Sequence, residues 1–381
     1  MNRKEIIRVS LLVLILISFA RFFLINSTKF ISRYDISYWE KEFSNSQVVK
    51  GGRAEHFFSD GELYAILGYK YILGQNPAQL HPEVPPFGKY LIGLGIYFFG
   101  NENATNIILS VGSLSLLYII SYEIFRDGNL ALIVVLLETL DTQFQELITS
   151  PNLDIPQLFL LLLSLLLFLK SQGRIKAIFL SGIFAGLAMA TKFFVNGFIL
   201  LCVYLVGILA KKDFKIFIRS LSILPGALLG YVLPYIVTIL NDPNPIHFFK
   251  FQRWLINWWA GNAQTQWGGI LSIIATGTWK TWWEDNGYIH VSAWNPLWPI
   301  IATMGLLSII SIGKLKDWKA FVIWIWCGFY LLFISTTSAF PRYLMALFPF
   351  LNLLTVYTLN SLFAMFTRQH RNFKLKPATI K

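Results

Sequence analysis

Long apolar stretches separated by short polar gaps make up most of this 381-residue chain. A helix needs about 20 mostly apolar residues to cross the hydrocarbon core of a bilayer, and many windows of that length carry almost no charge. We therefore predict an all-α, polytopic membrane protein with about ten transmembrane helices, in which residues 1–381 form a single unit. The predicted spans are 6–26, 105–125, 129–148, 155–170, 176–192, 193–210, 217–240, 295–313, 318–336 and 342–366.

Two long polar stretches, 27–104 and 241–294, are expected to be external loops. In the first, apolar residues recur at helical spacing and predict an amphipathic helix over 60–74. A second short helix is predicted over 87–99, because prolines favour its first turn and Gly100 its end. The second loop is rich in tryptophan, which indicates either an interfacial belt in the headgroup layer or a cap that stacks on a sugar or closes over a lipid. Its tryptophans are Trp254, Trp258, Trp259, Trp267, Trp279, Trp282, Trp283 and Trp294.

The distribution of positive charge predicts the orientation, because Lys and Arg are concentrated in short cytoplasmic loops. If the helix over 87–99 lies flat on the outer surface, every short basic gap falls on one side of the membrane. If it crosses the membrane, the gaps from Arg126 onward fall outside. We therefore predict a multi-pass cell-membrane protein with both termini inside and loops 27–104 and 241–294 on the extracytoplasmic face. The basic residues in question are Arg126, Lys170, Arg174, Lys176, Lys211, Lys212, Lys215, Arg219, Lys314, Lys316, Lys319, Arg368, Arg371, Lys374 and Lys376.

Composition agrees with a membrane protein. The chain is 55% hydrophobic with a mean hydropathy of +0.56, which is too apolar for a soluble globular protein. The net charge of +12 indicates membrane lipids with anionic headgroups as partners. Because the cations are divided among many separate loops, we expect no nucleic-acid partner. Cys202 and Cys327 fall within predicted spans, so neither a disulfide framework nor a cysteine metal site is indicated.

Acidic residues gather in two places that the predicted topology puts at the outer surface. Asp60 and Glu62 begin the helix in the first external loop, and Asp141 and Asp154 belong to a group where the third span ends and the fourth begins. For Asp60 and Glu62 alone, a solvated helix start is the simpler explanation. Ionisable groups near membrane depth, however, usually face a polar cavity. Two acidic groups facing one external site would suit general-base chemistry on an acceptor hydroxyl.

His81 and Glu83 lie two residues apart in the same loop. Together with Asp60 they could hold a divalent cation, although a hydrogen-bonded loop histidine and a solvated glutamate remain the simpler explanation. No cofactor is predicted with certainty.

Five cationic residues fall in the external loops or at outer helix ends, and contacts with lipid headgroups explain most of them. One or two could bind a phosphate and stabilise its charge as it leaves. Arg342 is the best candidate, because it opens the last predicted span directly after Pro341. The sequence has no Walker loop and no glycine-rich nucleotide fingerprint, which favours a substrate activated by a lipid phosphate over a nucleotide sugar. The five residues are Lys89, Lys192, His247, Arg253 and Arg342.

In the motifs that contain these residues, the sequence resembles the glycosyltransferase C (GT-C) superfamily, specifically the bacterial and archaeal relatives of the protein O-mannosyltransferases. The aminoarabinose lipid A transferases are more distant relatives. Each motif is weak alone, but their order and spacing over residues 55–360 are fairly specific. The motifs are Ser59-Asp60-Gly61-Glu62, His81 to Leu91, Leu140-Asp141 with Leu153-Asp154, Gly186 to Lys192, and Pro341-Arg342-Tyr343-Leu344.

The resemblance implies a membrane glycosyltransferase. Such an enzyme moves a mannose-like hexose from a polyprenyl-phosphate donor to a hydroxyl of a protein or lipid acceptor, with inversion, on the extracytoplasmic face. In this interpretation Asp60 is the base, and Glu62 and Asp154 orient the base or the acceptor. The donor phosphate would be held by Lys89, Arg342 and Lys192, and the substrate cavity would include Asp141, His247 and Arg253.

The sequence departs from the family pattern in two places. The family usually has an arginine between the two aspartates of the second acidic motif, where this chain has Thr149, and two extra residues split its His-Pro-Pro motif. A transporter or flippase of a lipid-linked saccharide is the alternative, since such proteins also carry acids at membrane depth. Transporters usually place these acids near the midplane between repeated halves, and no repeat is evident here.

Overall fold

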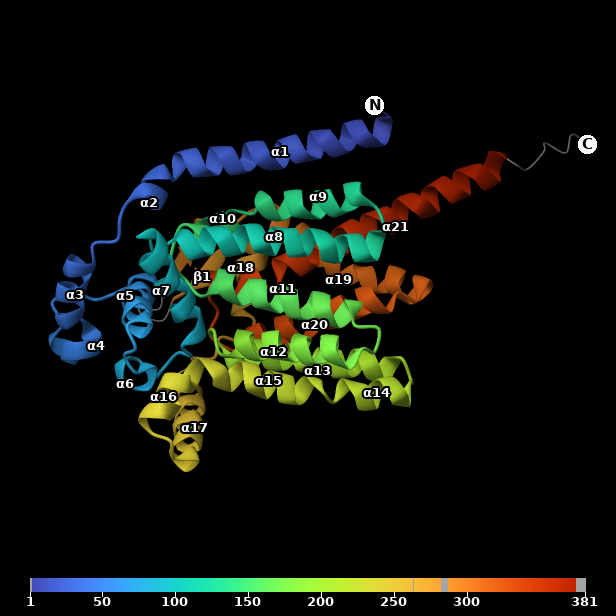
Figure 1. Cartoon of the computed structure of the whole chain (residues 1–381). Coiled ribbons are helices and arrows are strands. Elements are labelled where there is room, and N and C mark those ends of the chain that lie inside the picture. Colours follow the sequence, from blue (N-terminus) through green and yellow to red (C-terminus); the bar gives the residue numbers. More distant parts are fainter. Residues whose placement is uncertain (1, 263, 282–286, 375–381) are drawn as a thin grey trace, which may run out of the picture.

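A bundle of roughly parallel and antiparallel helices forms the body of the protein, and shorter helices cover one of its ends (Figure 1). The computed structural model describes residues 2–262, 264–281 and 287–374, with the backbone alone for residue 366 and residues 368–374. The start of α1 and the end of α21 lie at the end of the bundle opposite the short helices. The bundle contains α1 (Arg3–Ile25), α8 (Ala104–Phe125), α9 (Gly128–Thr139), α11 (Asp154–Lys170), α12 (Ile175–Met189), α13 (Phe194–Ala210), α14 (Phe214–Ser220), α15 (Ile223–Val232), α19 (Leu297–Leu315), α20 (Trp318–Ser335) and α21 (Phe348–Lys374).

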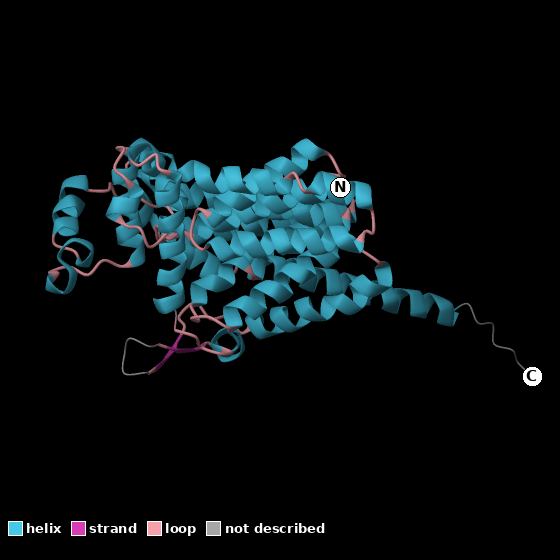
Figure 2. Cartoon of the chain, turned by 90° about the horizontal axis from the view of Figure 1, so that it is seen from below, coloured by secondary structure: helices cyan, strands magenta, loops and turns pink. Residues whose placement is uncertain are grey.

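The short helices and a two-stranded hairpin belong to the polar stretches of the sequence. Figure 2 shows how little strand the described chain contains, with the hairpin beside the end of the bundle. The strands pair antiparallel, with Thr278 opposite His290. These elements are α2 (Ser27–Ile31), α3 (Ile36–Ser44), α4 (Gln47–Lys50), η1 (Gly51–Arg53), α5 (Asp60–Ile72), α6 (Pro77–Leu80), α7 (Phe87–Phe99), α10 (Thr142–Ile148), η2 (Leu233–Tyr235), α16 (Ile236–Asn241), α17 (Pro245–Asn262), α18 (Gly269–Thr276), β1 (Thr278–Lys280), β2 (Tyr288–His290) and η3 (Pro341–Ala346).

The all-α, multi-pass prediction is confirmed. Among the described residues, six helices are long and apolar enough to cross a membrane, with Phe214–Asn241 counted as one. Four shorter apolar helices coincide with other predicted elements: Phe87–Phe99, Gly128–Thr139, Ile175–Met189 and Phe194–Ala210. The helix predicted over 87–99 has those bounds as α7, and Gly100 ends it in the left-handed conformation at φ +66°.

Three predicted spans differ from the structure. The span predicted over 129–148 breaks at Leu140-Asp141, because the Asp141 carboxylate accepts a hydrogen bond from the Phe144 amide and so starts α10. The span over 217–240 is divided into α14, α15, η2 and α16. The last span begins as the 3₁₀ segment η3, and its regular helix starts only at Phe348.

The packing of α5 against α7 fixes the position of the first acidic motif. A Cβ atom at Gly68 would overlap the backbone oxygen of Lys89, and one at Gly93 would overlap the backbone of Gly68. Only glycine permits two helix backbones to approach this closely. Ile66 and Leu67 on α5 and Ile92 on α7 are also fully buried. The start of α5 is therefore held rigidly against the end of the bundle.

Candidate functional site

A cavity of about 730 Å³ opens at the end of the bundle where the short helices lie. Its walls come from the start of α5, the α10–α11 connection, the β1–β2 hairpin and the start of η3. Of the predicted site residues, Asp60, Glu62 and Arg342 line it. Other polar lining residues are Lys29, Glu102, Asn103, Gln143, Glu146, Thr149, Asn152, His290 and Ser292.

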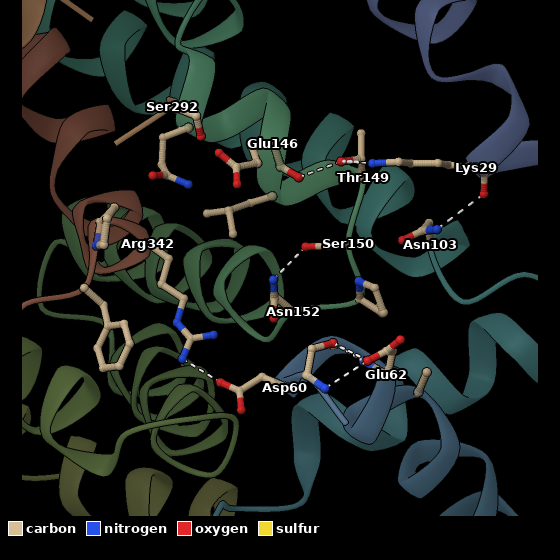
Figure 3. Close-up of a pocket in the computed structure, with 18 of the residues that line it drawn as sticks. Lys29, Asp60, Glu62, Asn103, Glu146, Thr149, Ser150, Asn152, Ser292 and Arg342 are labelled. Carbon is tan, nitrogen blue, oxygen red and sulfur yellow. Dashed lines mark hydrogen bonds and ion pairs between the residues drawn. The ribbon is translucent and has the colours of Figure 1, made fainter. Parts of the chain in front are cut away.

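Asp60 is the first residue of α5, and its carboxylate faces this cavity (Figure 3). Arg342 Nη2 donates a hydrogen bond of 2.6 Å to Asp60 Oδ2, although the two residues lie 282 positions apart in the sequence. The Asp60 side chain is 46% exposed, whereas that of Arg342 is 22% exposed. Within the described part of the chain, the other carboxylate oxygen of Asp60 has no hydrogen-bond partner. Asp60 is thus held in one orientation while one of its oxygens is available to a substrate.

Glu62 stabilises the start of α5. Its Oε2 accepts hydrogen bonds from the Ser59 backbone amide at 2.9 Å and from Ser59 Oγ at 2.7 Å. In return, Ser59 Oγ caps the amide of Glu62. This reciprocal pattern is a capping box, which satisfies amide groups that have no partner inside the helix. The geometry gives Glu62 a positioning function in addition to any contact with substrate.

Asp154 and Lys192 form a buried ion pair next to the cavity. Lys192 Nζ lies 2.6 Å from Asp154 Oδ1, and both side chains are about 95% buried. The Lys192 ammonium lies 4.9 Å from the centre of the Tyr343 ring. Tyr343 directly follows Arg342 in the sequence. Asp60 and Asp154 are both close enough to interact electrostatically with Arg342. Asp154 of the second acidic motif therefore does not line the cavity. It interacts electrostatically with Arg342, which does line it.

Lys89, His81 and Glu83 form a separate cluster behind Asp60. Lys89 is fully buried, and its ammonium contacts the Val84 carbonyl at 2.9 Å, His81 Nδ1 at 3.0 Å and the Tyr71 hydroxyl at 3.4 Å. Burial lowers the pKa of Lys89 to about 7. Burial, and then the charge of Lys89, lowers the pKa of His81 to about 2. Lys89, predicted to hold the donor phosphate, does not line the cavity, and its ammonium is directed at these three groups inside the chain.

The arrangement does not fit the divalent cation considered for His81, Glu83 and Asp60. His81 Nδ1 faces the Lys89 ammonium, Glu83 Oε2 lies 3.8 Å from His81 Nε2, and Asp60 pairs with Arg342 instead. In the described residues no group of three His, Cys, Asp or Glu side chains could hold a metal ion. A cation that already occupies one histidine nitrogen would repel a metal.

Three residues expected in the substrate cavity lie elsewhere. Asp141 Oδ2 accepts a 2.7 Å hydrogen bond from Trp298 Nε1, and Asp141 is buried between helices. His247 pairs with Asp242 at 2.8 Å on the exposed side of α17, and Arg253 is exposed on the same helix. The resemblance implied that all three line the substrate cavity, but none of them does.

The tryptophans of the second external loop are used in different ways. Trp259 Nε1 donates to the Glu83 carbonyl at 2.7 Å and so attaches α17 to the first loop. Trp279 lines the cavity. Trp267 is 80% exposed, as an interfacial residue would be. Trp282 and Trp283 lie outside the described residues.

Lys29 is a cavity residue that the sequence did not reveal. Its ammonium donates to Thr149 Oγ1 at 3.2 Å, and Figure 3 shows it on the side of the cavity opposite Arg342. The buried amides of Asn101 and Asn103 donate to its carbonyl at 2.9 and 3.3 Å, which fixes α2 beside the cavity. The contact places a cation beside Thr149 although the two residues lie 120 positions apart in the sequence. A single lysine in a polar stretch gives no spacing signal, and only the fold identifies it.

Comparison with known proteins agrees with this architecture. Residues 83–237 match the family model described as dolichyl-phosphate-mannose-protein mannosyltransferase. That segment contains Glu83, Lys89, Asp154 and Lys192, but neither Asp60 nor Arg342. No curated protein matches the sequence.

Two solved structures share most of the fold. ArnT from Cupriavidus metallidurans bound to undecaprenyl phosphate matches with a TM-score of 0.62 and 16% identity, over 86% of this chain and 62% of that one. Archaeal oligosaccharyltransferase AglB from Archaeoglobus fulgidus, in complex with an inhibitory peptide and a dolichol-phosphate, matches with a TM-score of 0.50 and 14% identity, over 97% of this chain and 52% of that one. This chain therefore spans about three fifths of the length of ArnT and about half that of AglB.

The fold is that of the GT-C type membrane proteins. The resemblance to the glycosyltransferase C superfamily, and within it to the protein O-mannosyltransferase relatives, is confirmed by the family match together with these folds.

Proposed function

We propose that the protein is an integral membrane glycosyltransferase that moves a sugar from a polyprenyl-phosphate donor to an acceptor hydroxyl. One observation carries the proposal: the Asp60 carboxylate is oriented by Arg342 in a cavity of about 730 Å³, and one of its oxygens faces that cavity. The cavity volume is within the usual range for small-molecule sites. The family match and the GT-C fold support the same class of reaction.

In the proposed reaction, Asp60 accepts the proton of the acceptor hydroxyl. The hydroxyl oxygen attacks the anomeric carbon of the donor sugar from the face opposite the phosphate. The bond between that carbon and the phosphate oxygen breaks, and its electron pair leaves with the polyprenyl phosphate. One such displacement inverts the anomeric configuration. Asp60 then releases its proton to solvent.

Cations around the cavity stabilise the charge of the leaving phosphate. Arg342 is the first of these, since its guanidinium carries several donors and uses one of them on Asp60. Lys29 is the second, because its ammonium faces the cavity with only the neutral Thr149 hydroxyl as its partner in the described chain. Lys192 acts from behind Arg342 through the field of its ion pair with Asp154. Lys89 contributes to the field around Asp60 from a buried position.

The orientation of the chain supports an extracytoplasmic site. The cavity lies at one end of the bundle, and the start of α1 and the end of α21 lie at the other (Figure 1). The turns at the terminal end contain Arg126, Lys170 and Lys319, as the positive-inside rule requires of cytoplasmic loops. A cysteine at exposed Glu55 should react with a membrane-impermeant maleimide in intact cells, whereas one at exposed Lys314 should not. The opposite labelling pattern would place the cavity inside the cell.

The matched proteins support a choice of substrates to test. The ArnT structure holds undecaprenyl phosphate and the AglB structure a dolichol-phosphate, so we propose a polyprenyl-phosphate sugar as donor. The family description names mannose on protein, which makes a mannose-like hexose and a protein or lipid hydroxyl the first substrates to test.

Transfer from a radiolabelled polyprenyl-phosphate sugar by the purified protein in lipid tests this proposal. Acceptor-containing membrane extract is added, and free polyprenyl phosphate is measured with and without EDTA. Release that depends on the extract supports the transferase, and equal release with EDTA agrees with a site that uses no divalent metal. The Arg253→Gln variant is the matched control for variants of cavity residues such as Asp60→Asn, because Arg253 is exposed and does not line the cavity. No release from any common donor would refute the transferase and favour transport of a lipid-linked saccharide.

A further inference from the structure

α17 runs across the direction of the bundle helices and projects from the side of the bundle, at the end that carries the candidate site (Figure 1). It packs against the bundle through aromatic contacts. The rings of Phe248 and Phe251 lie 5.5 and 6.1 Å from the ring of Tyr235, and the ring of Trp259 lies 4.8 Å from that of Phe193. At helical spacing, the three α17 residues share one face of the helix.

Both points of contact lie at the same level of the membrane. Tyr235 lies 16 positions after Arg219, and Phe193 lies 18 positions before Lys211. At a rise of 1.5 Å per residue, these segments are about 24 and 27 Å long, close to the ~30 Å thickness of the hydrocarbon core. Arg219 and Lys211 lie in basic turns at the opposite end of the bundle. α17 is therefore held at the bilayer surface on the side of the candidate site.

The helix face that supports α17 is exposed at the depth of the acyl chains. Leu224, Leu228, Tyr231 and Tyr235 recur at helical spacing along α15 and η2, and the Tyr231 hydroxyl donates to Gln252 Oε1 of α17 at 2.5 Å. Leu224 and Leu228 are 56% and 65% exposed. Leucines in the hydrocarbon core contact lipid chains. Lipids that line this face of α15 therefore extend directly to the level of α17.

The exposed part of α17 has an apolar side and a polar side. Phe249 and Ile256 lie seven positions apart, on one line of the helix, and are 71% and 48% exposed. Lys250 and Asn257 directly follow them in the sequence, are rotated by about 100° around the helix axis, and are also exposed. An apolar line beside a polar one is the pattern of a helix that lies in the plane of the membrane interface.

We propose that α17 is an interfacial helix that lies in the lipid leaflet on the side of the candidate site. Phe249 and Ile256 contact the first carbons of the acyl chains, and Lys250 and Asn257 face headgroups and water. Lipid is the occupant of the apolar line, because the lipid-facing surface of α15 continues to the level at which α17 rests. The inference does not depend on the proposed transferase reaction.

An α17 held in the leaflet would also fix the level of the candidate site. Trp259 donates to the Glu83 carbonyl at 2.7 Å and packs on Phe193. Phe193 in turn lies 5.4 Å from the ring of Tyr343, which directly follows Arg342. The helix is thus connected through two aromatic contacts to the segment that carries Arg342.

Spin labels on α17 of the full chain in phosphatidylcholine nanodiscs test this inference. Accessibility to oxygen, which is enriched in the acyl region, is compared with accessibility to a water-soluble nickel chelate. The ratio of oxygen to nickel accessibility should be several times higher at the first and third positions than at their neighbours, corresponding to a depth of about 5–10 Å below the headgroup boundary. The labelled variants are Phe249→Cys, Lys250→Cys, Ile256→Cys and Asn257→Cys.

The neighbouring positions are matched controls, because each pair differs by a single step along the helix. The background carries Cys202→Ser, and Cys327 stays, because it is fully buried and should take no label. Each labelled protein must melt like the wild type.

Two results would overturn the inference. High nickel accessibility at all four positions would place α17 in water, away from the leaflet. Exclusion of both reagents from the labels at Phe249→Cys and Ile256→Cys would show that protein covers this side of the helix, either a second copy of the chain or another partner.

Discussion

Replacement of Arg342 by Gln removes the charge that orients Asp60 while it keeps a side chain that can donate hydrogen bonds. A hydrogen bond between charged groups contributes about 1.5–3 kcal/mol, and the 2.6 Å contact with partial burial of Arg342 places this pair within that range. If Arg342 acts on the reaction chiefly through Asp60, loss of this energy in the transition state lowers kcat/KM by about 10- to 150-fold. The same pair exists in the folded protein without substrate, so stability should also fall, by about 1 kcal/mol after allowance for the solvation of nearly half of the Asp60 side chain.

A double-mutant cycle distinguishes this coupling from independent effects. Transfer rates would be measured for Arg342→Gln, Asp60→Asn and the double variant, with thermal melting as the control for folding. Because part of the Arg342 effect is expected to act through Asp60 and part on the donor phosphate, the loss in the double variant should be smaller than the product of the two single losses. A loss equal to that product would mean that Arg342 acts on the donor phosphate alone, independently of the carboxylate, and would refute the orientation argument.

Three further predictions concern the residues around Asp60. Glu62→Gln should keep most activity, because Gln can still accept hydrogen bonds from Ser59. Glu62→Ala should lower stability by about 1 kcal/mol through loss of the cap. A large activity loss in Glu62→Gln at unchanged melting temperature would show a direct role of Glu62 in the reaction. Asp154→Asn should destabilise the protein by about 3–5 kcal/mol, because it leaves the Lys192 ammonium buried and unpaired. Adding Lys192→Met to the same chain should restore much of the melting temperature. No recovery would contradict the ion-pair account. Burial lowers the pKa of Lys89 from its ordinary 10.5 to about 7, so between these values the unfolded state binds more protons and stability should rise with pH by up to about 1.4 kcal/mol per unit. A melting temperature that responds to pH 7–9.5 identically in wild type and Lys89→Met would exclude this assignment.

Much of the fold could be predicted, because membrane spans and helix ends leave local signals. The apolar stretches predicted an all-α bundle, and the prolines and Gly100 around 87–99 predicted the bounds of α7. The break at Leu140-Asp141 was missed, because hydropathy averages over a window and a single capping aspartate scarcely changes it.

The site was predictable only in part, because its contacts join residues that are distant in the sequence. Asp60 and Arg342 were each identified from their motifs, but nothing in the sequence indicated that they would pair across 282 positions. The burial of Lys89 depends on the glycine contact between α5 and α7, and the position of Lys29 depends on the side chains of Asn101 and Asn103. Such arrangements depend on tertiary packing, so they cannot be predicted from periodicity or spacing along the chain.

The central claim is that Asp60 is the base of a sugar transfer from a polyprenyl-phosphate donor. The most direct test is release of polyprenyl phosphate by purified wild-type protein and by Asp60→Asn, measured in the same lipid with the same donor and acceptor extract. Asn preserves the shape of the side chain and can still contact Arg342, but it does not accept the proton. We predict that the folded variant loses transfer almost completely, with a rate reduction of about 100-fold or more. An Asp60→Asn protein that keeps a substantial fraction of the wild-type rate would contradict the account.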